Sequence, residues 1–111
     1  MPLRIHLTYP TVFVLQALSN GYHYGFDIMD ATELPSGTVY PILRRLEEAR
    51  MATSKWEDEQ AARREQRPAR RYYEITAAGE GALAEGLKKY RVLERALSSG
   101  PLKTRPSQAR G

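Results

Sequence analysis

The sequence predicts a mostly helical protein with one small β-hairpin, and three observations support this fold class. Apolar residues recur at helical spacing in three segments before residue 50. Residues 51–57 and 70–76 instead combine strand-forming side chains with some alternation of apolar and polar positions. Helical periodicity then returns over residues 77–98. With 111 residues, the chain forms one small domain, near the size at which a second subunit helps to bury apolar surface.

The first two helices are short and close together. Pro10 suits the first turn of a helix over residues 11–20, and Gly21 suits its end. This helix is apolar over most of its circumference, so it must be covered on more than one side. A second helix is expected over residues 24–31, and Pro35 prevents it from continuing.

The third helix, residues 36–48, has one apolar stripe and one polar face. The stripe consists of Val39, Ile42, Leu43 and Leu46, at positions i, i+3, i+4 and i+7. The opposite face carries Gly37, Pro41, Arg44, Arg45 and Glu48, and Ser36 is a suitable N-cap. A helix anchored on one side, with small residues at its start and two exposed arginines, is typical of a DNA recognition helix. Together with the preceding helix it predicts a helix-turn-helix.

The two predicted strands enclose a largely polar segment, 58–69, and form a wing beside the helices. We expect Trp56 and Tyr73 to pack from the wing onto the core. Five of the six charged residues in 60–71 are arginines, which accounts for the whole net charge of +4. Such a segment is typical of nucleic-acid binding, although a solvated charged loop has the same composition. Arg63, Arg64 and Arg67 are candidate DNA contacts; for Arg70 and Arg71, structural pairing with carboxylates is an equal alternative.

The last helix, residues 77–98, begins after a capping residue, Thr76. Its apolar residues follow a seam suited to another helix, beside a row of small residues that includes Gly86. We expect a dimer interface formed by Val12, Phe13, Leu83, Leu87, Tyr90, Leu93 and Leu97. The predicted organisation is an arm (1–9), a winged helix-turn-helix (10–76), a dimerisation helix (77–98) and a disordered basic tail (99–111).

The composition argues against several other classes of protein. The chain has no cysteine, and the isolated His6 and His23 do not suggest a metal site or a cofactor. No apolar run approaches the roughly 20 residues of a membrane span, so we expect a cytoplasmic protein without membrane contact. No nucleophile elbow or glycine-rich phosphate loop is present, and Glu47 and Glu48 look like surface charge, so we expect no enzyme.

Three ordered blocks, residues 21–28, 34–47 and 70–79, resemble the PadR family of bacterial transcriptional regulators in sequence and spacing. The resemblance implies a winged helix that binds DNA as a homodimer through its terminal helices, usually as a repressor. By matching positions, it implies DNA contacts at Ser36, Gly37, Thr38, Tyr40, Arg44 and Arg45. Tyr24 falls at the start of the helix that braces the recognition helix, and we count it as a further candidate DNA contact. The chain resembles the short subtype of the family.

The chain departs from the family at several positions. Relatives often have glycine where this chain has Glu33 and Arg50, so both residues are predicted to adopt a left-handed backbone conformation. Some short members bind flat aromatic drugs against a tryptophan between their dimer helices. Here the single tryptophan, Trp56, falls on a wing strand, which does not support such a pocket.

The sequence therefore predicts a homodimeric repressor of transcription that binds double-stranded DNA at a palindromic operator. An unknown signal would release it, such as a small-molecule effector lodged between the terminal helices. The alternative is a winged-helix module that binds another protein and no DNA.

Overall fold

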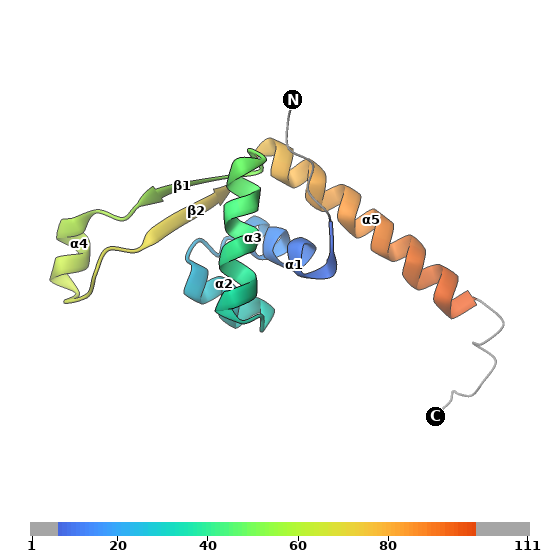
Figure 1. The fold of residues 1–111 in the computed structure, drawn as a ribbon, viewed down its shortest axis with the longest axis horizontal. Helices are drawn as coiled ribbons and strands as arrows, with labels where there is room; N and C mark the ends of the chain where they lie inside the picture. The colour runs from blue at the N-terminus through green and yellow to red at the C-terminus, as the bar shows by residue number, and fades with distance from the viewer. Residues whose placement is uncertain (1–6, 100–111) are drawn as a thin grey trace.

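The computed structural model describes residues 7–99, so the first six residues of the predicted arm and the predicted tail beyond Ser99 lie outside it. In chain order, the elements are α1 (Tyr9–Ser19), α2 (Gly25–Thr32), α3 (Ser36–Glu48), β1 (Ala52–Trp56), α4 (Glu59–Arg64), β2 (Arg71–Ile75) and α5 (Ala77–Ser99). The predicted mostly helical fold with one hairpin is confirmed. We call α1–α3 the helical body and residues 52–75 the wing. Figure 1 shows the wing and α5 leaving the helical body on opposite sides.

Helix α1 is the centre of the hydrophobic core. It contacts α2, α3, β2 and α5, which confirms that it is covered on more than one side. Val14 and Leu15 of α1 have no exposed surface, and they pack with Ile28 of α2 and with the whole apolar stripe of α3. Phe13 lies on the remaining side of α1 and is 46% exposed. The core therefore holds α3 by its predicted apolar stripe and leaves the opposite face outside.

The wing is an antiparallel hairpin in which Ala52 pairs with Ile75 and Trp56 pairs with Arg71. The segment before α2 lies along its other edge. The Tyr73 amide donates to the carbonyl oxygen of His23 at 2.8 Å, and His23 Nδ1 donates to the carbonyl oxygen of Tyr73, also at 2.8 Å. This pairing attaches the wing to the start of α2.

Helix α5 begins as predicted, because the Gly79 amide donates to Thr76 Oγ1 at 3.1 Å. Its first half packs on α1. A Cβ atom on Gly86 would lie 2.7 Å from Cγ2 of Val12, so the small residue allows the two helices to approach closely. Beyond Tyr90, by contrast, all residues from Arg91 to Leu97 are exposed. No helix within residues 7–99 combines the length and the apolar character needed to cross a membrane.

The predicted left-handed residues are confirmed, with φ angles of 60° at Glu33 and 62° at Arg50. Gln66, at φ 58°, is a third such residue that the sequence analysis did not identify. Each lies where the chain reverses after a helix, a position that glycine usually takes. All three residues have a Cβ atom, so each turn carries some backbone strain.

Three local predictions were wrong. Pro35, and not Ser36, is the N-cap of α3, and no side chain caps that helix. The polar segment 58–69 contains a short helix, α4, because Asp58 caps it by accepting from the Gln60 amide at 3.3 Å. Trp56 does not pack on the core but is 65% exposed, whereas Tyr73 is 7% exposed as expected. Trp56 is the last residue of β1 and pairs with Arg71 at the end of the strands farther from α3 and α5, and the hairpin extends beyond the helical body (Figure 1).

Candidate nucleic-acid interface

The exposed face of α3 is the first part of the candidate interface. Arg44 and Arg45 both point to solvent from the side opposite the buried stripe. Neither guanidinium has an ion-pair or hydrogen-bond partner among residues 7–99, so Glu48 does not neutralise Arg44. Ser36 and Gly37 are also exposed at the start of the helix, and Thr38 is half-buried. Two cations on a rigid helix therefore remain available to a ligand outside the chain.

Tyr40 lies at the edge of this face, where α3 meets α2 and β2. Its side chain is 44% exposed, and its ring packs against Gly25, the first residue of α2. A cavity of about 170 Å³ opens beside it, lined by Tyr24, Gly25, Phe26, Tyr40, Arg70, Arg71 and Tyr73. The cavity brings together the predicted contact residues Tyr24 and Tyr40 and two arginines of the wing. Burial raises the pKa of the Tyr73 phenol, which keeps this group protonated.

Arg70 and Arg71, where the chain enters β2, are largely engaged by the chain itself. The guanidinium of Arg70 lies 4.1 Å from the centre of the Tyr24 ring, a cation–π contact. Tyr24 in turn meets the Tyr72 ring edge-on. Arg70 Nε is buried and has no hydrogen-bond partner within the described residues. Arg70 therefore orients Tyr24 and retains one unsatisfied donor next to the cavity.

Glu47 connects α3 to both strands of the wing. Its carboxylate accepts a hydrogen bond of 2.6 Å from Ser54 Oγ on β1 and lies 3.8 Å from Arg71 on β2. Arg71 Nε donates to Ser54 Oγ at 3.0 Å, which closes the group. The sequence predicted Glu47 to be surface charge, and this prediction was wrong. The contacts join α3 to both strands of the wing.

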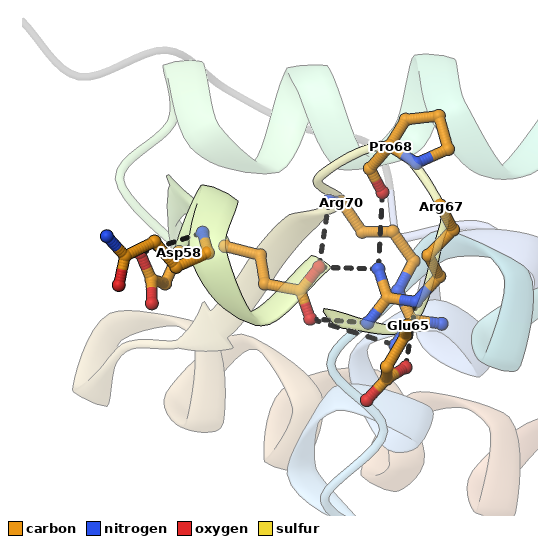
Figure 2. Close-up of polar contacts among 7 residues, drawn as sticks. Asp58, Glu65, Arg67, Pro68 and Arg70 are labelled. Carbon is orange, nitrogen blue, oxygen red and sulfur yellow. Dashed lines mark hydrogen bonds and ion pairs between the residues drawn. The ribbon is translucent and has the colours of Figure 1, made fainter. Parts of the chain in front are cut away.

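The middle of the wing is held by Arg67, which the sequence predicted as a DNA contact. Its two terminal nitrogens donate to the two carboxylate oxygens of Glu57 at 2.6 and 2.7 Å. Arg67 also donates to Glu65 at 3.0 Å and to the carbonyl oxygen of Pro68 at 3.2 Å (Figure 2). The Arg67 side chain is 23% exposed and that of Glu57 is 13% exposed. The structure therefore gives Arg67 a place inside the wing, where its charge is already paired.

This ion pair has a clear electrostatic consequence. The hydrogen bonds from Arg67 lower the pKa of the Glu57 carboxyl from 4.5 to about 2, with a further contribution from the Arg70 amide. The same contact raises the pKa of Arg67. Both groups are therefore charged throughout the neutral and mildly acidic range, and the pair closes the loop after α4.

The tip of the wing presents Arg63 and Arg64 from the end of α4. Arg63 makes only a 4.0 Å pair with Glu59, and both side chains are about 80% exposed. Arg64 is exposed and has no partner in the part of the chain that the structure describes. Available arginines thus lie on two elements, α3 and α4, and Figure 1 shows these two helices well apart.

The predicted dimer residues fall into three groups by burial. Val12 and Leu83 are 3% and 5% exposed because they belong to the core of the chain itself. Leu87 and Tyr90 are partly buried against that core. The Tyr90 ring stacks on the Tyr9 ring, with 3.9 Å between the ring centres. The predicted dimer residues that remain at the surface are Phe13, Leu93 and Leu97, between 43% and 70% exposed, and Val92 on the same half of α5 is 56% exposed.

Comparisons with known proteins agree with this architecture. A family model described as the transcriptional regulator PadR-like family matches residues 14–85, more than half of the chain. No curated protein sequence matches.

Solved structures share the fold. A PadR family transcription regulator from Clostridium difficile R20291 is 23% identical, with a TM-score of 0.71 over 82% of this chain and 96% of that one. A PadR-like transcription factor from Bacteroides fragilis is 25% identical, with a TM-score of 0.66, and the match covers 79% of this chain and 85% of that chain. Bordetella bronchiseptica BpsR, whose DNA binding is regulated by 6-hydroxynicotinic acid, is 21% identical, with a TM-score of 0.65. The match covers 90% of this chain and 69% of that chain.

Proposed function

Because this chain belongs to the PadR-like family of transcriptional regulators, we propose that it is a homodimeric repressor that binds a palindromic operator in double-stranded DNA. The observation that carries the proposal is the pair of unpartnered arginines on the exposed face of α3. Each exposed cation on a helix that fits the major groove can contact a phosphate or a guanine without first breaking an internal ion pair.

In this mechanism, α3 enters the major groove with its N-terminal residues toward the base edges. Ser36, Gly37 and Thr38 are short and allow a close approach, and Arg44 and Arg45 reach base edges or phosphates. Tyr24 and Tyr40 line the cavity at the border of this face and contact the adjacent sugar-phosphate backbone. Arg63 and Arg64 at the wing tip contact the flanking backbone, while Arg67 holds the wing in shape.

The second half of α5 would pair with a second copy of the chain. Phe13, Leu93 and Leu97 are exposed apolar side chains on α1 and α5, and burial of such groups drives association. A two-fold dimer would place its two α3 helices about one turn of DNA apart, roughly 34–36 Å, which requires a palindromic operator. We propose no dimer contact for Val12 or Leu83, which the core of the chain itself already buries.

Release of the operator would follow from a small molecule bound near the terminal helices. A surface groove lined by Tyr9, Leu87, Tyr90, Arg91, Glu94 and Leu97 borders the proposed dimer face. A ligand in this groove would change how two copies meet, and therefore the spacing of their recognition helices. The regulation of DNA binding in BpsR by a small aromatic acid supports an effector of this general kind.

Selection of bound sequences from random DNA tests the proposal directly. We expect enrichment of a palindrome, a complex of two chains per site, and a log affinity that falls with log salt by about 0.9 per phosphate contact. A reporter gene placed behind the selected site then tests repression. Failure to enrich any sequence, together with salt-independent behaviour on heparin, would instead favour a winged-helix module that binds protein.

A further inference from the structure

The contact between α2 and α3 contains an unusual requirement for glycine. Gly25 begins α2, and its φ angle is not among the positive ones, so its backbone conformation does not require glycine. A Cβ atom built on Gly25 would lie 2.5 Å from the Cε1 and Cζ atoms of Tyr40 and would also overlap its hydroxyl oxygen. Real Cβ atoms do not approach other atoms so closely, and Tyr40 would have to move.

Little else restrains the end of the Tyr40 side chain. Its hydroxyl group has no hydrogen-bond partner within residues 7–99, and 44% of the side chain is exposed. The ring borders the cavity that also contains Arg70 and Arg71. The direction of the phenol therefore depends on the close packing of its ring on Gly25.

We infer that Gly25 is a positioning residue for DNA recognition: its missing side chain sets where Tyr40 presents its hydroxyl group to the operator backbone. This inference rests on the proposed function. Gly25 itself is buried and need not touch DNA. A methyl group at residue 25 would turn the phenol away from the backbone without altering either arginine of α3.

A purely structural role of Gly25 would give a different experimental result. If the Gly25 contact only stabilises the fold, Gly25→Ala lowers the melting temperature but leaves the affinity of the folded fraction unchanged. If Gly25 acts through Tyr40, the effects of Gly25→Ala and Tyr40→Ala on affinity are not additive, because both remove the same contact.

The experiment is a double-mutant cycle on the full-length protein and its selected operator. We expect Tyr40→Ala and Gly25→Ala each to weaken binding about tenfold, the loss typical of one hydrogen bond to a charged group. The double variant should bind no more weakly than Tyr40→Ala alone. Tyr40→Phe, which keeps the ring on Gly25, should lose a similar factor with an unchanged melting temperature.

The chain offers a matched control. A Cβ atom on Gly81 of α5 would have nothing within 4 Å, so Gly81→Ala adds the same methyl group without a collision and should leave affinity unchanged. Additive losses in the cycle, or wild-type affinity for Gly25→Ala, would overturn the inference.

If Gly25→Ala alone does not fold, the variant that combines Gly25→Ala with Tyr40→Ala still tests the inference. It lacks the Tyr40 ring with which the new methyl group would collide. Equal affinities of the double variant and Tyr40→Ala support the inference, and a weaker double variant contradicts it. If Tyr40→Ala binds the operator with wild-type affinity, the inference is also rejected. If Arg44→Ala and Arg45→Ala still weaken binding in the same assay, the proposed function stands.

Discussion

The arginines of α3 and those of the wing differ in what they are free to do. The wing has five arginines between residues 60 and 71 and is the more conspicuous basic segment. Yet Arg67, Arg70 and Arg71 contact carboxylates or aromatic rings of the chain itself. Arg44 and Arg45 on α3 have no such partner within the described residues. The number of cations in a segment therefore overstates the charge that the segment can offer to a ligand.

The difference follows from how the two regions are stabilised. Helix α3 is anchored by four buried apolar side chains. The wing is a two-stranded hairpin, and such hairpins are marginally stable when they stand alone. Within α4, only Ala62 is buried, so this outer part of the wing has almost no hydrophobic core. The polar network around Arg67 holds it together instead. Three of the five wing arginines therefore support the structure of the wing, whereas both exposed arginines of α3 remain without a partner within the described residues.

The largest expected effect comes from the available arginines. We expect Arg44→Ala combined with Arg45→Ala to weaken operator binding by about 2–6 kcal/mol, given about 1–3 kcal/mol per base-contacting arginine. The melting temperature should not change, since neither side chain supports the fold. Titrations at several salt concentrations measure the affinity and the slope of log affinity against log salt, which we call the salt slope. Lys88→Ala combined with Lys89→Ala removes the same charge from α5 and should have a much smaller effect.

An intermediate effect is expected from the engaged arginine. Arg67→Ala leaves the nearly buried Glu57 carboxylate without its main partner, so the amides of the wing should exchange hydrogen faster. Operator affinity should fall by less than for the α3 variants, because only the order of the wing is lost. Glu57→Gln should loosen the wing in the same way. A lowered salt slope with unchanged amide exchange would instead identify Arg67 as a phosphate contact.

The same ion pair predicts a pH dependence. The pKa of Glu57 is lowered from 4.5 to about 2 by the Arg67 hydrogen bonds, so its contribution to stability is present above pH 4.5. That contribution is lost as the pH falls from 4.5 toward 2. Amide exchange in the wing, measured across this range, should accelerate in the wild type relative to Glu57→Gln. Parallel profiles for the two proteins would show that the pair does not hold the wing.

The smallest effect is expected at the wing tip. Arg63→Ala should change the free energy of unfolding by less than about 0.5 kcal/mol, because its pair with Glu59 is exposed and long. The salt slope should fall by about 0.9 for one lost phosphate contact. Glu59→Ala breaks the same pair but keeps the arginine, so it should retain the slope. Equal slopes for all three proteins would remove the wing tip from the interface.

The sequence was informative where burial determines structure. The stripe of α3, the burial of Tyr73 and the cap at Thr76 were predicted correctly from local patterns of residues. The two left-handed turns at Glu33 and Arg50 were expected from the family resemblance, because relatives often have glycine there, and they are confirmed. Helix α4 was missed because six residues are too few to display a helical period.

The engagement of individual charges was not predictable in the same way. Arg67 and Glu57 are ten residues apart and meet only because the loop after α4 folds back. Glu47 meets Ser54 and Arg71 only because the wing leaves the body at one angle. A pattern of charges along the chain contains no information on these pairings, so the sequence could suggest a basic surface but not which arginines form it.

The exposed position of Trp56 has a practical consequence. It is the only tryptophan of the chain, and the Arg71 guanidinium lies 5.2 Å from its ring. Its fluorescence therefore reports from the wing alone, without a contribution from the core. Emission that shifts to the blue when operator is added would show that the wing itself becomes covered, and the intrinsic signal makes an attached dye unnecessary.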